Sequence, residues 1–306
     1  MPLDPAAQAV LNLLEEAGGP PLEEQTPEEA REFIKALAAL GGEGAVVASV
    51  DERDVGGVPA LVITPTGDGP FPVLVWIHGG GWVIGSAVDS QATARDLAAG
   101  AGCIVVSVDY RLAPEHKAPA ALDDCIAATR WVLDHASELG GDPSRVAVGG
   151  DSAGGNLSAL VALELGDRLC YQVLVYPATD LSMAGPHPSL DENADGYLLT
   201  KAAMQWFIDH YLVDSGITSD DLRVSPLNAP DAALRRTPPA FVLTAEFDPL
   251  RDEGEAYADR LRAAGVDVTH RRFDGQIHAF YSMPLAIPAS VEALAQTAEL
   301  LAKAFI

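Results

Sequence analysis

Basic residues are scarce in this chain. Its 306 residues include 19 lysines and arginines against 44 aspartates and glutamates, which gives a formal net charge of -25 at pH 7. A surface of that sign repels nucleic-acid phosphates and anionic lipid headgroups. A candidate basic pair, Arg271-Arg272, lies inside a strand-like run and makes no patch. We therefore expect no nucleic-acid partner and no membrane-surface partner.

Cysteine is also scarce, and long apolar runs are absent. Cys103, Cys125 and Cys170 lie far apart in the chain and are odd in number, which argues against a disulfide framework and is typical of a reducing cytoplasm. No run of 18 or more apolar residues is present to span a bilayer, and no basic segment precedes an apolar stretch at the N-terminus. These absences predict a cytoplasmic protein in which all three cysteines are small buried hydrophobic side chains.

Short apolar runs alternate with helical stretches from about residue 45 onward. This alternation indicates βαβ units, and therefore a mostly parallel central sheet that helices cover on both faces. The predicted class is α/β. The expected strands are 46–50, 59–64, 73–77, 103–108, 146–148, 173–176, 241–244 and 266–273.

Two helices are predicted ahead of the first strand, over 6–16 and 27–40. The second has a clear start signal, because Thr26 can cap it, Pro27 suits its first position and Glu29 completes a capping-box spacing. These helices are expected to pack on the sheet domain as an arm or as part of a lid.

More than sixty residues separate Pro177 from the strand-like run that begins at Phe241. This stretch is rich in Pro and Asp at first and helical from 200 to 212, and it is too long for an ordinary loop. We interpret it as an insertion beside the sheet. The expected organisation is N-terminal helices at 1–45 that contribute to a cap, a core at 46–179 and 231–306, and a cap insertion at 180–230.

The segment around residue 152 carries the most informative motif. A strand-like run leads into residues 150–154, which read Gly-Asp-Ser-Ala-Gly, and a helical run over 157–165 follows. Glycines two positions before and after the serine allow the tight turn of a nucleophile elbow. The helix N-terminus behind the serine favours developing negative charge. The pattern predicts Ser152 as a nucleophile, the alternative being a glycine-rich turn without covalent chemistry.

Residues 78–82 read His-Gly-Gly-Gly-Trp, directly after the strand expected at 73–77. Three consecutive glycines let backbone N–H groups face a cavity without side chains in the way, as an oxyanion hole requires. The alternative is a flexible glycine turn. The position at a strand end, in a chain that also contains a serine elbow, favours the oxyanion interpretation.

A serine nucleophile needs a base and an acid that orients the base. Of the seven histidines, His278 lies in a loop just past the last strand. Asp248 lies where a strand ends and Pro249 is expected to open the next helix, with Glu246 and Asp252 as rivals nearby. The order Ser, Asp, His along the chain matches that of α/β-hydrolases. The histidines set aside are His78, expected to brace the glycine loop, and His116, His135, His187, His210 and His270.

Together these motifs resemble the hormone-sensitive-lipase family of α/β-hydrolases, the bacterial family IV esterases. The resemblance implies a capped α/β-hydrolase core with Ser152, Asp248 and His278 as triad. It also implies an oxyanion hole made by the N–H groups of Gly80, Gly81 and Ala153. Ala279 stands where the family more often has glycine, which narrows the room beside the base. The matching segments are 78–82, 109–115, 150–155, 176–177, 248–252 and His278.

The resemblance further implies a carboxylic ester hydrolase that forms an acyl-enzyme and acts on short to medium acyl esters. No cofactor is expected, and no His-x-x-x-His or clustered Cys/His spacing indicates a metal. An amidase, deacetylase or lactonase with the same triad, and a non-catalytic small-molecule binding protein on this fold, remain open. A homodimer through the helix at 290–304 is also open. The aromatic residues expected to line a substrate pocket between cap and core are Trp82, Phe33, Trp206, Phe207 and Tyr211.

Overall fold

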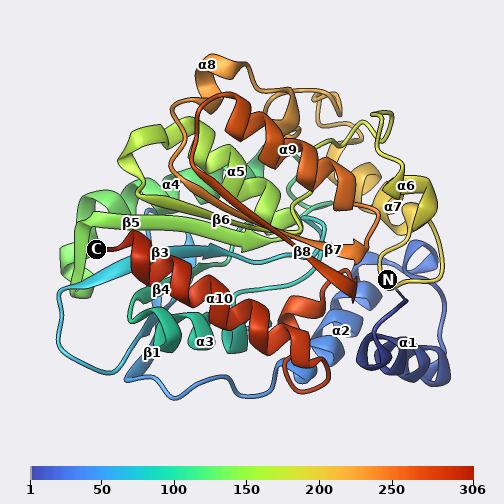
Figure 1. Ribbon diagram of the computed structural model, residues 1–306, viewed down its shortest axis with the longest axis horizontal. Coiled ribbons are helices and arrows are strands. Elements are labelled where there is room, and N and C mark those ends of the chain that lie inside the picture. Colours follow the sequence, from blue (N-terminus) through green and yellow to red (C-terminus); the bar gives the residue numbers. More distant parts are fainter. Residues whose placement is uncertain (1) are drawn as a thin grey trace.

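A single eight-stranded sheet forms the centre of the computed structural model, which describes residues 2–306 (Figure 1). The strand order is β1-β2-β4-β3-β5-β6-β7-β8. β2 pairs antiparallel with β1 and β4, whereas all the remaining pairs are parallel. The strands are β1 Ser49–Asp54, β2 Pro59–Thr64, β3 Phe71–Ile77, β4 Ile104–Val108, β5 Gly141–Asp151, β6 Tyr171–Val175, β7 Ala240–Phe247 and β8 Val268–Ile277.

Helices bury both faces of this sheet, as Figure 1 shows. In β3, Val73 and Val75 pack toward α4 and α5, whereas Leu74 and Trp76 point toward α3 and α10. Because both faces are covered, the central strands are continuous apolar runs. The helices are α1 Pro5–Ala17, α2 Pro27–Ala38, α3 Gln91–Ala101, α4 Ala120–His135, α5 Ala153–Leu165, α6 Ser189–Glu192, α7 Lys201–Leu212, α8 Asp231–Leu234, α9 Arg251–Ala263 and α10 Pro288–Ala304.

The expected mostly parallel sheet with helices on both faces is confirmed, although some boundaries differ. The first strand begins at Ser49 rather than at 46, because its antiparallel partner β2 ends at Thr64, directly opposite Ser49. Its last four residues, Asp51–Asp54, are exposed and charged, and charged edge strands avoid pairing with other chains. Apolar patterning alone therefore placed this strand too early.

Helix α2 begins at Pro27, as the sequence predicts, whereas α1 begins at Pro5, one residue before its predicted start. The Thr26 hydroxyl accepts a hydrogen bond from Glu29 N at 3.3 Å, and Thr26 N donates to Glu29 Oε2 at 2.9 Å, which completes the capping box. In Figure 1, α1 and α2 lie at the same end of the molecule as α6 and α7 of the insertion, where the central parallel strands end.

The cysteines match the sequence prediction only in part. Cys103 and Cys125 are buried, but Cys170 is half-buried, and all three are free thiols. Burial raises the pKa of the Cys103 thiol to about 12 and that of Cys170 to about 11. In the described chain, no helix combines the length and apolar character that crossing a bilayer requires.

Candidate active site

Ser152 lies at the sharp turn between β5 and α5. Its backbone has φ 56° and ψ -118°, a strained conformation for a residue with a side chain. Gly154 permits the turn, since a Cβ there would lie only 1.9 Å from the carbonyl oxygen of Ile77. The strand, the turn and the helix thus form the predicted elbow and present the serine hydroxyl at the carboxyl edge of the sheet.

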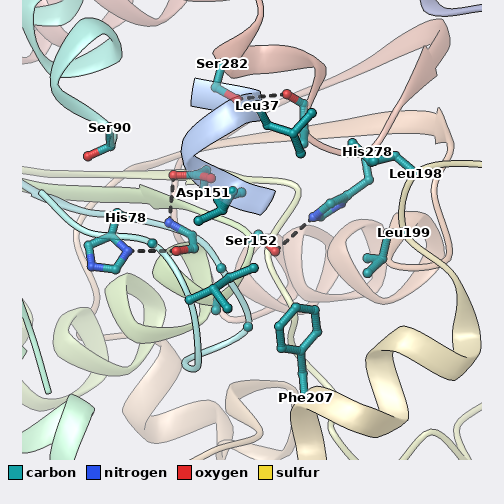
Figure 2. A pocket seen from close by; sticks show the side chains of 18 of the residues that line it. Leu37, His78, Ser90, Asp151, Ser152, Leu198, Leu199, Phe207, His278 and Ser282 are labelled. Carbon is teal, nitrogen blue, oxygen red and sulfur yellow. Dashed lines mark hydrogen bonds between the residues drawn. The ribbon is translucent and has the colours of Figure 1, made fainter. Parts of the chain in front are cut away.

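Asp248 and His278 reach Ser152 from the ends of the neighbouring strands β7 and β8. Figure 2 shows the imidazole of His278 directed at the serine hydroxyl, and the Oγ–Nε2 distance is 2.9 Å. On the other side of the ring, Nδ1 lies 2.7 Å from Asp248 Oδ2. Asp248 is fully buried, and its Oδ1 accepts a hydrogen bond from Leu250 N at 2.9 Å. The structure thus brings together the side chains of Ser152, His278 and Asp248, the three residues selected from the sequence.

The rival acids and bases have other partners. Glu246 accepts a hydrogen bond from Gly275 N at 2.7 Å, and Asp252 pairs with Arg251 at 2.7 Å. His78 stacks on the ring of Tyr110 at 4.2 Å, and burial lowers its pKa. Within residues 2–306, His278 is the one histidine hydrogen-bonded to the Ser152 hydroxyl. One detail of the prediction is wrong: Pro249 lies in a turn, and α9 begins at Arg251.

The glycine loop after β3 lies against the elbow. Gly79 N donates to Asp151 Oδ1 at 3.1 Å, the contact drawn beside Asp151 in Figure 2. Asp151 is half-buried, and burial raises the pKa of its carboxyl to about 6. Gly80, Gly81 and Ala153 line the same cavity as Ser152. In the part of the chain that the structure describes, their N–H groups donate to no protein acceptor.

The cavity above Ser152 has a volume of about 180 Å³ and mostly apolar walls. Phe33, Trp82 and Phe207 line it, as the sequence predicted. Trp206 and Tyr211 do not, so the prediction is wrong for these two side chains. Tyr211 is fully buried and stacks on Trp82 at 4.8 Å, whereas Trp206 packs against His210 at 4.3 Å. Lining residues that the sequence reasoning missed are Leu22, Ile34, Leu37, Leu198, Leu199, Met204, Ile208, Leu250 and Met283.

A buried glutamate at the cavity wall was also missed. Glu253 is 3% exposed and accepts hydrogen bonds from Thr179 N at 2.6 Å and Asp180 N at 3.2 Å. Burial raises the pKa of its carboxyl to about 8. No sequence pattern separates Glu253 from the other acidic residues of α9, because the feature that distinguishes it is its depth in the tertiary structure.

Comparison with known families agrees with this geometry. A family model described as the alpha/beta hydrolase fold matches residues 74–282. The chain belongs to this family.

The particular kind of α/β-hydrolase follows from the relatives. Carboxylesterase NlhH of Mycobacterium tuberculosis is 44% identical over 256 residues, which cover 80% of this chain and 79% of the relative. Ethyl acetate hydrolase of Pseudomonas putida is 35% identical over an alignment of 323 positions, which covers 98% of this chain and 99% of the relative. The protein is a serine-type carboxylic ester hydrolase of the hormone-sensitive-lipase-like family IV.

Solved structures of esterases superimpose on the whole chain. A thermostable esterase from Pseudomonas putida ECU1011 has a TM-score of 0.92 at 39% identity, covering 100% of this chain and 98% of its own. A hyperthermophilic esterase from Pyrobaculum calidifontis has a TM-score of 0.92 at 36% identity, covering 99% of each chain. The known esterases therefore share the central sheet with its helices, and also the N-terminal helices and the insertion that lie where the parallel strands end.

Proposed function

We propose that Ser152, His278 and Asp248 are the catalytic triad of this ester hydrolase. The observation that carries the proposal is the continuous hydrogen-bonded chain from the serine hydroxyl through the imidazole to a buried carboxylate. Because ionised Asp248 can only accept, His278 Nδ1 carries the proton and Nε2 is free to accept one from Ser152.

In the first half of the reaction, Ser152 Oγ attacks the ester carbonyl carbon while its proton passes to His278 Nε2. The carbonyl oxygen becomes an oxyanion, which accepts hydrogen bonds from the N–H groups of Gly80, Gly81 and Ala153. His278 then donates its proton to the departing alcohol, leaving Ser152 acylated. In the second half, water gives a proton to His278 and attacks the acyl carbon, and the acid leaves as Ser152 regains its proton.

The substrates we propose are esters of short to medium acyl chains. The cavity of about 180 Å³ is smaller than the range of about 300–1,000 Å³ that is common for drug-sized ligands. Its apolar walls suit a small hydrocarbon group. The name of the Pseudomonas putida relative, ethyl acetate hydrolase, describes such a substrate for that protein. A small neutral ester fits these properties better than a long-chain fat.

We also propose that the N-terminal helices, 1–45, and the insertion, 180–230, form one cap over a core at 46–179 and 231–306. Both segments supply lining residues, including Ile34 from α2 and Met204 from α7. Arg31 joins α2 to the core, since its Nε donates to Val83 O at 2.9 Å and its Nη2 donates to Glu115 Oε2 at 2.7 Å. Lining residues from both segments give the acyl chain an apolar surface to bind against.

The triad is tested by replacing Ser152 with alanine. Turnover of p-nitrophenyl esters should fall to near background, and a fluorophosphonate should modify the Ser152 peptide of the parent and not of the variant. The Ser152→Ala, His278→Ala double variant should lose little more than either single variant, because triad members act as a unit. Substantial turnover by Ser152→Ala would refute the assignment. A series of p-nitrophenyl esters fastest at the longest chains would refute the proposed substrate class.

A further inference from the structure

The turn that carries Asp248 is bonded to the inserted segment. Asn193 follows α6, and its side-chain Nδ2 donates to the main-chain oxygen of Asp248 at 3.1 Å and to that of Glu246 at 3.4 Å. The side chain lies in the interior, since the residue is only 4% exposed. Solvent therefore does not readily replace these bonds when the amide is removed.

Ser189, at the start of α6, makes a second attachment to the same turn. Its hydroxyl donates to Pro249 O at 2.8 Å and accepts from Asp252 N at 3.1 Å, while Ser189 N donates to Asp252 Oδ2 at 2.7 Å. Ser189 is fully buried. Asn193 thus binds the carbonyl oxygen of Asp248, and Ser189 binds that of the next residue, Pro249. Ser189 also binds the first turn of α9.

This attachment lies where the sheet stops supporting the chain. The pairing of β7 with β8 shifts register between Ala245 and Phe247, and Phe247 opposite Ile277 is its last pair. Asp248 is the next residue, so no strand ladder holds it. Its carboxylate nevertheless has to keep Oδ2 within 2.7 Å of His278 Nδ1. The position of the main chain at Asp248 therefore depends on bonds from outside the sheet.

We propose that Asn193 and Ser189 are positioning residues for the catalytic acid. The insertion then has two roles: it covers the pocket, and it holds the Asp248 turn so that His278 stays aligned with Ser152. This inference rests on the triad proposed above. The contacts reach from the insertion to the turn across 55 and 60 residues of sequence.

The first test compares single variants at a temperature where all of them are folded. Asn193→Ala and Ser189→Ala should each lower kcat about ten-fold with KM nearly unchanged, because they misplace a catalytic group and leave the pocket walls in place. Ser189→Thr retains a hydroxyl and should restore most of kcat. The matched control is Asp191→Ala, also on α6, where an exposed carboxylate pairs with Lys201; its kcat should equal that of the parent.

The second test shows whether Asn193 acts through Asp248. In an Asp248→Ala background, adding Asn193→Ala should lower the residual kcat no further, because the group that Asn193 positions is already gone. If Asn193→Ala lowers kcat by the same factor in the parent and in the Asp248→Ala variant, the loss reflects general structural damage and the proposal is overturned. Parental kcat in both alanine variants would also overturn it. Should Asn193→Ala fail to fold, the Ser189→Ala and Ser189→Thr pair decides. An active Ser152→Ala variant would instead refute the triad itself.

Discussion

Gly81 offers the sharpest test of how the cap and the oxyanion loop fit together. Its φ is +56°, and a Cβ built on it would lie 2.2 Å from Cδ1 of Phe207. A normal contact between two carbon atoms is about 3.5–4.0 Å, so one of the two groups has to move by more than an ångström. The same Cβ would lie 2.3 Å from Cγ of Phe207, the ring atom nearest the helix, so rotation of the ring does not relieve the clash. We therefore expect the glycine loop to move.

We expect Gly81→Ala to lower kcat by about 10²–10³, the usual cost of losing one oxyanion donor. The left-handed backbone adds a stability cost of about 1–2 kcal/mol. Kinetics on p-nitrophenyl acetate, together with thermal unfolding, separate the two effects. The matched control is Gly102→Ala, which has φ +62° and no atom within 4 Å of its Cβ. The control should lose similar stability and retain parental kcat.

A double variant checks the steric cause. Phe207→Ala removes the ring that a Cβ at residue 81 would strike, so adding it to Gly81→Ala should recover part of the lost kcat. Phe207→Ala alone should act mainly on KM, because it enlarges the pocket. Parental kcat in Gly81→Ala would refute the reasoning from the loop geometry. Absence of any recovery in the double variant would show that the clash with Phe207 is not the cause.

Three further predictions concern stability. Burial raises the pKa of Glu253 to about 8, so the folded state retains a proton that the unfolded state loses near pH 4.5. Stability should therefore fall by a few kcal/mol as pH rises from about 4.5 to 8. Glu253→Gln should remove this part of the slope in urea unfolding, and an unchanged slope would contradict the assignment. Ala279 has a left-handed backbone with φ +65°, so Ala279→Gly should relieve about 1–2 kcal/mol of strain. Glycine also costs about 0.5–1 kcal/mol in chain entropy on folding, so the net effect should be a slight rise in Tm. A clear decrease in Tm would contradict this prediction. Thr26→Ala should cost about 1 kcal/mol by removing the helix cap, with kcat unchanged, and an unaltered Tm would show that the capping box contributes nothing.

The sequence by itself determined the features that local chemistry specifies. A nucleophile elbow requires small residues on either side of one serine. The sequence meets this requirement with Gly150 and Gly154, two positions before and after Ser152. Helix α2 begins at its capping box because the partners Thr26 and Glu29 are three residues apart. The order of strands and helices was also predictable, because the spacing of apolar residues and the residues that favour turns are properties of short segments.

The tertiary structure decided what depends on contacts between distant segments. Trp206 and Tyr211 lie on the same helix as Phe207, yet only Phe207 lines the cavity, because helix packing selects the face that turns toward it. The raised pKa values of Asp151 and Glu253 come from burial, which composition does not reveal. Asn193 bonds to the Asp248 turn from 55 residues away, with no motif connecting them. The direction of a side chain and its burial are fixed only when the whole chain packs. These two properties decide which residues line the pocket, which pKa values shift and which residues bind the Asp248 turn.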